Sequence, residues 1–279
     1  MTIKNLSDLS FDTVIECFLL AFEDYDIKMP TDRNYYKKRW KAAKVDLNLS
    51  YGMFDNEKLI GFIIHAIDKR AGILTAFNTG TGVIPEYRGN RIVKSIYEYA
   101  LNDLQHNGIE KSTLEVITKN VRAIRSYESV GFKITKTYKC YDGSIKIENN
   151  DQFELIEIAL KNVDWKKLPN QQYYSWDFQK ETVLEGSYTF FQVLNNNQPE
   201  SYFIINPKNR YLAQFDILNT ENKGWERLFM AIKQISNEIR IINVDDRLKY
   251  KLDYIELIGL ENSVNQYEME LDIRGGNTG

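Results

Sequence analysis

The sequence contains little cysteine and histidine and no long apolar run. Cys17 and Cys140 are too few for a disulfide-rich secreted scaffold. His65 and His106 are too few for a His-rich metal centre, so no metal is predicted. No apolar run approaches the ~18 residues of a membrane-spanning helix, and the N-terminus lacks a signal-peptide pattern. These absences predict a cytoplasmic protein without a membrane partner.

Neither half of the chain has the basic cluster typical of a nucleic-acid-binding protein, so no nucleic-acid partner is predicted. The net charge of −3 is unevenly spread. Residues 1–150 contain 22 Lys and Arg against 19 Asp and Glu, a net of +3, and residues 151–279 contain 14 against 20, a net of −6. The basic half suits an anionic ligand, although ordinary variation in surface composition explains the difference equally well.

The composition is otherwise that of a folded protein, with 43% hydrophobic and 27% charged residues. Eighteen Tyr, fourteen Phe and four Trp supply bulk for its cores. Domains typically run to about 100–200 residues, so 279 residues favour two domains.

Hydrophobic periodicity predicts a strand meander followed by alternating helices and strands in the first half. The expected strands are 2–6, 49–54, 59–67, 73–83, 112–117, 132–141 and 153–160. The expected helices are one that is capped by Ser10 or Asp12 and runs to about residue 24, followed by 33–44, 92–104 and 120–130. Residues 161–176 are polar, contain Pro169 and are expected to be a linker.

One stretch joins the end of a strand to the start of a helix, with the sequence VIPEYRGNRIV from Val83 to Val93. Backbone N–H groups at a helix N-terminus lack internal partners, so such a corner binds phosphate. Gly89 lets the backbone approach closely, and Arg88 and Arg91 can contact phosphate oxygens. The alternative is a tight turn with solvated arginines.

A second stretch lies at the next junction of strand and helix. Asn120 can bind a ligand or cap the helix, and Ala123 and Tyr127 share one helical face. The dipeptide Gly131-Phe132 follows the helix.

Together the two stretches resemble the GNAT superfamily of acyl-CoA-dependent N-acyltransferases. The first resembles its V-x-P-x-x-R-G-x-G-x-(G/A) motif, except that Arg91 and Val93 replace small residues. The second matches its N-x-x-A-x-x-x-Y-x-x-x-G-F motif throughout. The resemblance covers residues 1–160. It implies an α/β (α+β) domain with a mixed, mostly antiparallel sheet flanked by helices.

The resemblance also implies acetyl-CoA as the cofactor. The backbone of Val83 would bind the pantetheine arm, with Asn120, Ala123 and Ser126 beside it. Tyr127 would face the thioester sulfur. The pyrophosphate would lie on the backbone amides of Arg88, Gly89, Asn90, Arg91, Ile92 and Val93.

In this reaction an amine attacks the thioester directly, in a ternary complex. Tyr127 is the predicted acid for the leaving thiolate, and the alternative is a packed core tyrosine. The strand 73–83 contains no Asp or Glu, so Glu115 is the nearest candidate base. Asn78 and Thr79 can only orient an amine or a water. His65 is interpreted as a core histidine and Cys140 as a structural residue.

Residues 177–273 partly repeat the order of elements in the first half. Gly259-Leu260 stands where Gly131-Phe132 stands, while residues 220–224 replace the R-G-x-G loop. The repeat predicts a degenerate GNAT-like domain, the alternative being an unrelated small α+β domain. It would cover the acceptor side or mediate homodimerisation. Residues 274–279 are expected to be a disordered tail.

The sequence therefore predicts an N-acetyltransferase acting on a primary amine of a small molecule or peptide. The alternative is a non-catalytic acyl-CoA-binding regulatory protein, because the expected base is missing and the phosphate loop is altered. A phosphate-loop nucleotidase is excluded, since the G-x-x-x-x-G-K-(S/T) pattern is absent.

Overall fold

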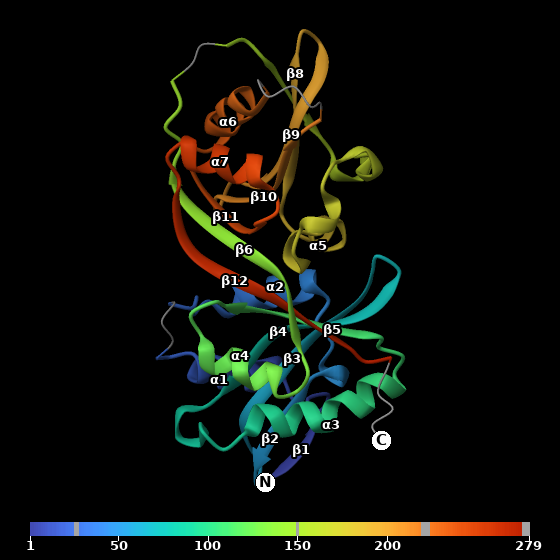
Figure 1. Ribbon diagram of the computed structural model, residues 1–279. Coiled ribbons are helices and arrows are strands. Elements are labelled where there is room, and N and C mark those ends of the chain that lie inside the picture. Colours follow the sequence, from blue (N-terminus) through green and yellow to red (C-terminus); the bar gives the residue numbers. More distant parts are fainter. Residues whose placement is uncertain (25–27, 149–150, 219–223, 275–279) are drawn as a thin grey trace. The chain divides into compact units, whose positions relative to one another are not determined.

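The computed structural model describes residues 1–24, 28–148, 151–218 and 224–274 (Figure 1). The chain divides into two compact units. Unit 1 comprises Met1–Thr135 with Tyr267–Gly279, and unit 2 comprises Lys136–Gln266. All but the last residue of the loop 220–224, and all but the first of the tail 274–279, lie outside the described residues. No helix in the described ranges is long and apolar enough to cross a membrane.

Unit 1 is a mixed sheet in the order β1-β2-β3-β4-β5-β12-β6 with helices packed against it. The pairs from β1 to β4 are antiparallel, and β4 and β5 are parallel. Its elements are β1 (Thr2–Asn5), α1 (Phe11–Ala21), α2 (Arg33–Ala43), β2 (Tyr51–Asp55), β3 (Lys58–Arg70), β4 (Ile73–Val83), α3 (Ile92–His106), β5 (Lys111–Ile117), α4 (Val121–Glu128), β6 (Lys133–Ser144) and β12 (Glu261–Asp272).

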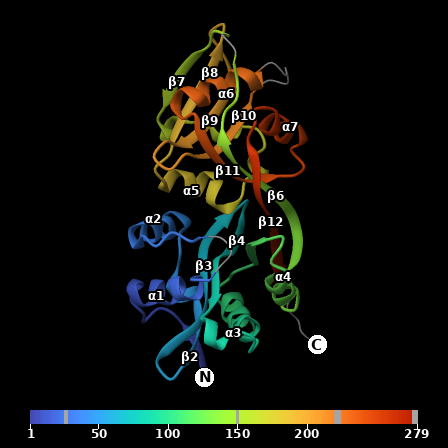
Figure 2. The same cartoon turned by 90° about the vertical axis from the view of Figure 1, so that its left-hand side faces the viewer.

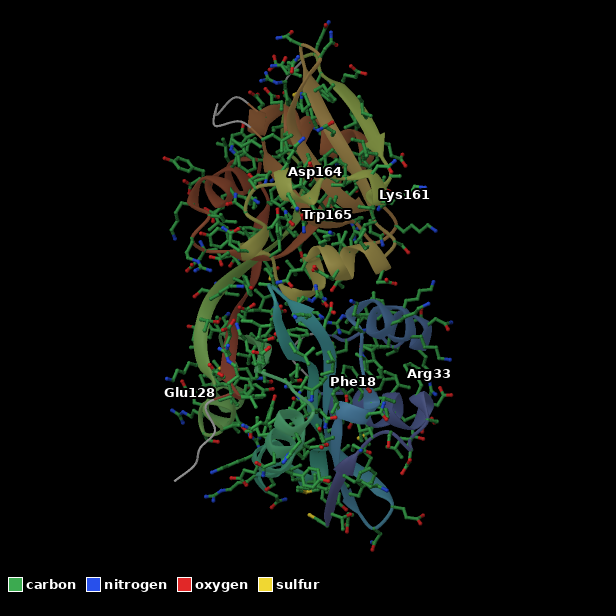
Figure 3. The ribbon with its side chains drawn as sticks, turned by 90° about the vertical axis from the view of Figure 1, so that its right-hand side faces the viewer. Phe18, Arg33, Glu128, Lys161, Asp164 and Trp165 are labelled. Atoms are coloured by element: carbon green, nitrogen blue, oxygen red, sulfur yellow. The ribbon has the colours of Figure 1, made fainter. Side chains whose placement is uncertain are left out.

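Two helices cover opposite faces of the β3–β4 hairpin (Figure 2). The Ser10 hydroxyl caps α1 by accepting from the Thr13 amide, and the apolar face of α1 turns Phe18 toward the sheet (Figure 3). A Cβ placed on Gly80 of β4 would lie 2.9 Å from Phe18. A Cβ on Gly61 of β3 would lie 2.7 Å from Ile92 of α3. These glycines therefore let α1 and α3 approach the sheet closely.

Unit 2 follows the order of elements of unit 1, except that one α-helix instead of two precedes its strand meander. Its sheet runs β12-β6-β11-β10-β9-β8-β7, with β10 and β11 parallel and the pairs from β7 to β10 antiparallel. Its further elements are β7 (Glu154–Ile158), α5 (Lys180–Glu185), β8 (Thr189–Asn195), β9 (Gln198–Asn206), β10 (Tyr211–Ile217), α6 (Gly224–Ile235), β11 (Glu238–Asp245) and α7 (Lys249–Leu257). The predicted mixed, mostly antiparallel fold class is confirmed.

Each unit takes one strand from the other half of the sequence. In unit 1, β12 lies between β5 and β6, and in unit 2, β6 lies between β12 and β11. The Lys111 ammonium of β5 pairs with Glu270 of β12 at 3.1 Å, and the Ile273 amide donates to the Glu110 carbonyl at 2.9 Å. Met269 is completely buried in the core of unit 1. Residues near the end of the chain thus complete the sheet of the first unit.

The residues expected to form a linker, 161–176, lie inside unit 2. They contain short 3₁₀ helices, and Trp165 lies against the smaller of the unit's two apolar clusters (Figure 3). Leu168 and Tyr174 are buried in the same cluster. The aromatic side chains of this stretch thus pack into a hydrophobic core of unit 2, although its polar composition and its proline, Pro169, are typical of a linker. The chain crosses between the units at residues 135–136 and 266–267 instead.

Candidate active site

A β-bulge at Thr79 separates β4 from β5. The β3–β4 register passes from Ile64↔Gly80 to His65↔Asn78, which leaves Thr79 as the extra residue. The parallel pairing of β4 with β5 ends at Asn78↔Leu114. Within the described register, β4 continues to Val83 and β5 to Ile117 without further pairs between them. Backbone groups on this edge of β4 can therefore bind an extended ligand as an added strand would.

The side chain of Asn78 holds the bulge in shape. Its Oδ1 accepts from the Gly80 amide at 3.0 Å. Its Nδ2 donates to the Thr81 hydroxyl at 2.6 Å and to the Tyr97 hydroxyl at 2.7 Å. Burial raises the pKa of Tyr97 well above its usual value, so this phenol stays neutral. The sequence-based interpretation missed Tyr97, whose only signal is its place beside Ile96 on α3.

The loop between β4 and α3 contains two residues with left-handed backbone, Gly89 at φ +89° and Arg91 at φ +54°. Arg91 stands where the GNAT motif has glycine, and the positive φ explains that preference. Arg91 is also the N-cap of α3 and makes no side-chain cap. The first intrahelical bond runs from the Ser95 amide to the Arg91 carbonyl. The amides of Ile92 and Val93 precede that bond and are placed to hold an anion.

The Arg88 guanidinium is directed into unit 1 and not toward the loop. Its Nε donates to the Val83 carbonyl at 3.1 Å, and its Nη2 donates to the Ala21 carbonyl at 3.0 Å. Both terminal nitrogens also contact the Asp24 carboxylate, at 2.6 and 2.7 Å, which lowers the pKa of Asp24. The Arg88 amide donates to Pro85. Arg88 therefore ties the end of α1 to the loop, and the amides from Gly89 onward are left as the anion cradle.

A second arginine, which the sequence-based interpretation missed, stands beside this loop. A Cβ on Gly89 would lie 4.0 Å from Nη2 of Arg122, an exposed residue in the first turn of α4. Arg91 is exposed as well. Two guanidinium groups thus accompany the N-terminus of α3. The only sequence signal for Arg122 is its place next to Ala123.

Helix α4 positions the remaining residues of the second motif. Asn120 is its N-cap, and its Oδ1 accepts from the Ala123 amide at 3.1 Å. Ala123 and Ser126 are half-buried. Tyr127 is 8% exposed, and its ring packs edge-on against Tyr97 and Phe132. Asn120 is therefore a helix cap, and the Tyr127 ring lies beside the residues that shape the bulge.

Glu115 is the first residue of β5 beyond the last pair with β4. It is half-buried, whereas its neighbours Leu114 and Val116 are buried in the core of unit 1. Because side chains alternate along a strand, Glu115 faces the opposite side of the sheet from these two.

The structure places the remaining titratable candidates in cores. The His65 ring is completely buried, and its Nδ1 donates to the Leu49 carbonyl at 2.7 Å. Burial lowers the pKa of His65 to about 4. Cys140 is buried in unit 2 beside Asn243. These placements agree with the interpretation of both residues as structural.

Residues 12–132 match the model of the acetyltransferase (GNAT) family. These residues lie in unit 1, which therefore contains a GNAT acyltransferase domain. A curated relative, N-alpha-acetyltransferase 30 of Schizosaccharomyces pombe, is 26% identical over 109 residues, which are 38% of this chain and 69% of that protein. The family predicted from the two motifs is confirmed.

Solved GNAT structures resemble the chain over nearly its whole length. A putative acetyltransferase from Pyrococcus horikoshii aligns with a TM-score of 0.68 at 13% identity, over 97% of this chain and 89% of that one. A tandem GNAT protein from the clavulanic acid biosynthesis pathway aligns with a TM-score of 0.70 at 11% identity, over 100% and 99%. At this identity the likeness concerns the fold, and it supports a GNAT-like fold in both halves of this chain.

Proposed function

We propose that unit 1 transfers an acetyl group from acetyl-CoA to a primary amine of a small molecule or peptide. The observation that supports this most is the bulge at Thr79, which frees one edge of β4 immediately before a helix N-terminus without a side-chain cap. An edge of this kind suits the amides of pantetheine, and the helix N-terminus suits a pyrophosphate.

The proposed cofactor site extends from the bulge to the loop. Pantetheine would lie along β4 as far as Val83, opposite Asn120, Ala123 and Ser126 of α4. The pyrophosphate would accept from the amides of Gly89, Asn90, Arg91, Ile92 and Val93. Arg91 and Arg122 would add charge-assisted contacts. Arg88 would act indirectly, by fixing the loop against α1.

In the proposed reaction the neutral amine attacks the thioester carbonyl. An amide on the free edge of β4 stabilises the oxyanion. When the tetrahedral adduct collapses, the carbon–sulfur bond breaks and the thiolate takes the phenolic proton of Tyr127. The proton lost by the amine passes to Glu115 or to water, and water afterwards restores the proton of Tyr127.

A thiol-release assay with acetyl-CoA and a panel of amines tests the proposal. The panel includes peptides with free α-amino groups, because the curated relative is named for N-alpha-acetylation. We expect Tyr127→Phe to lower kcat at least tenfold, since it removes the acid, while the Kd for acetyl-CoA stays within about twofold. The matched control is Tyr99→Phe, at a tyrosine of α3 that is 48% exposed, which should leave kcat unchanged.

A non-catalytic acyl-CoA-binding regulatory protein is the second candidate. It is favoured by β4, which contains no carboxylate, and by Arg91, which replaces a motif glycine. Tight binding of acetyl-CoA without thiol release from any amine would support this candidate and overturn the enzymatic proposal.

A further inference from the structure

Unit 2 repeats the feature that opens β4 from β5. The β9–β10 register shifts between Leu212 and Gln214, so Ala213 is the extra residue of β10. In the described register the parallel pairing of β10 with β11 consists of Tyr211↔Arg240, before the bulge. Strand β10 ends four residues after its bulge, as β4 does. Unit 2 therefore has the strand geometry of the site proposed in unit 1.

Helix α7 likewise repeats α4. The N-cap of α4 is Asn120, and the left-handed Gly131 lies eleven residues later. The N-cap of α7 is Leu248, and the left-handed Gly259 again lies eleven residues later. The third residue after each cap is therefore equivalent. It is Ala123 in unit 1 and Lys251 in unit 2.

The Lys251 side chain extends to the freed edge of β10. Its Nζ donates to the Phe215 carbonyl at 2.7 Å and pairs with the Asp216 carboxylate at 2.8 Å. The Phe215 ring lies 4.6 Å from Nζ, and the Tyr174 hydroxyl lies 3.3 Å away. Lys251 is 3% exposed. Phe215 stands two residues beyond the bulge, as Thr81 does in unit 1, so the ammonium binds the strand segment that pantetheine would bind there.

The carboxylate of Glu200 lies at the N-terminus of α6. A Cβ on Gly224, the first residue of α6, would lie 3.2 Å from Cγ and 3.4 Å from Cδ of Glu200. The Glu200 carboxylate is buried and accepts from Nε and Nη2 of Arg227 on the same helix, at 2.7 and 2.5 Å. A carboxylate at a helix N-terminus is stabilised as a phosphate would be. The equivalent strand position in unit 1 is the apolar Ile60, since the Ile84 amide donates to Ile60 as the Leu218 amide donates to Glu200.

We propose that unit 2 is an internally filled copy of the acyl-CoA site, in which Lys251 replaces pantetheine and Glu200 replaces the pyrophosphate. The cavity that remains beside Lys251 measures about 10 Å³, far below the ~300–1,000 Å³ usual for ligand pockets. The chain therefore binds one acyl-CoA, in unit 1. The stoichiometry rests on the proposed function, whereas the filling of unit 2 does not.

Isothermal titration with CoA tests the stoichiometry. We expect one CoA per wild-type chain, and no heat of binding for Gly89→Asp, which places a carboxylate in the proposed cradle of unit 1. Arg122→Glu should weaken binding at least tenfold. Two CoA molecules per chain, or binding that persists in Gly89→Asp, would overturn the inference. A folded wild-type chain without any CoA binding would instead overturn the proposed function, and the filling is then decided by the next experiment.

Rescue of Lys251→Ala by propylammonium tests whether the Lys251 side chain fills the site in unit 2. The variant leaves Asp216 buried without its cation, so its melting temperature should fall by roughly 10 °C. Propylammonium, which matches the deleted atoms, should restore at least half of that loss, whereas tetramethylammonium at equal concentration should restore none. The matched control is Lys249→Ala, at an exposed residue of the same helix, which should melt like wild type. Wild-type melting of Lys251→Ala, or equal effects of the two ions, would contradict the filling.

If Lys251→Ala does not fold, Lys251→Met and Asp216→Asn replace it. Each single change leaves one member of the pair unmatched, so the double variant should lose less stability than the sum of the two single losses. Strict additivity would overturn the inference.

Discussion

Arg91 illustrates how a single residue departs from its family at a cost. Its backbone is left-handed at φ +54°, a conformation that costs a residue with a side chain roughly 1–2 kcal/mol and costs glycine little. The exposed guanidinium can offset this cost by binding the pyrophosphate, since Arg91 lies on the loop proposed to hold that group. Replacing Arg91 by glycine should therefore stabilise the fold and weaken the binding of CoA.

We expect Arg91→Gly to raise the free energy of unfolding by about 1 kcal/mol and to weaken CoA binding several-fold. Denaturant unfolding and titration calorimetry measure the two effects. Arg91→Asn is the matched control, because asparagine tolerates the left-handed conformation but lacks the charge. It should weaken binding to a similar degree. If Arg91→Gly binds CoA like wild type, Arg91 makes no phosphate contact.

His65 is the residue whose burial predicts a pH dependence. Its native pKa of about 4 lies below the ~6.5 of an unfolded histidine, so the unfolded chain binds more protons between these values. Stability from this group is complete above pH ~6.5 and decreases as the pH falls toward 4, by up to about 3 kcal/mol.

Urea unfolding at pH 7, 5.5 and 4.5 should show this decrease in wild type. His65→Gln should flatten it, because glutamine does not titrate. His106→Gln, at the chain's other histidine, which is exposed, should keep the wild-type slope. An unchanged slope in His65→Gln would mean that other groups govern acid stability.

Sequence patterns predict the residues of the site better than their side-chain directions. The motif locates Gly89 and Tyr127 through spacing alone. It does not reveal that Arg88 pairs with Asp24 or that Arg122 reaches the loop, because side-chain direction depends on tertiary contacts. For the same reason Asn120 is identified correctly as a junction residue, while the choice between cap and ligand needs the structure.

At the scale of elements, the bulge in β4 depends on one amide side chain. The Asn78 side chain makes three hydrogen bonds at the Thr79 bulge, to Gly80, Thr81 and Tyr97. All three groups lose a hydrogen-bond partner if the side chain is removed, and a buried group left unsatisfied costs about 1–3 kcal/mol.

We expect Asn78→Ala to lower the free energy of unfolding by about 2–4 kcal/mol and to weaken acetyl-CoA binding more than Arg122→Lys does. Thermal unfolding and calorimetry provide the readouts. Asn102→Ala, at an exposed residue of α3, is the control and should change neither. Normal affinity in a folded Asn78→Ala protein would show that the bulge does not shape the cofactor site.

Elements themselves are predictable wherever their signal is local. The meander of β2, β3 and β4 follows from alternating apolar residues, and α3 and α4 follow from helical periodicity. The position of β12 between β5 and β6 has no such signal, because Lys111 and Glu270 are 159 residues apart. The sequence therefore suggests a first domain that ends at residue 160, whereas unit 1 also needs residues 267–273.

At the scale of the whole molecule, unit 1 depends on β12 from the end of the sequence, so we expect that residues 1–160 do not fold alone. The fragment lacks β12, which removes the buried Met269 and Ile273 from the core and the strand neighbour from β5. We expect it to show no cooperative thermal transition and no CoA binding. Truncation after Arg274 is the control and should melt like wild type. A fragment 1–160 with a sharp transition and a dispersed NMR spectrum would contradict this prediction.

The position of β12 next to β5 also determines when the sheet of unit 1 can be completed during translation. β5 emerges from the ribosome long before the strand that must lie next to it, and at ~5–20 residues per second the delay is roughly 10–30 s. During that interval the nascent chain exposes an unpaired strand edge, which is a template for wrong pairing. We therefore expect that slower translation of the second half of the chain increases the dependence of this protein on chaperones.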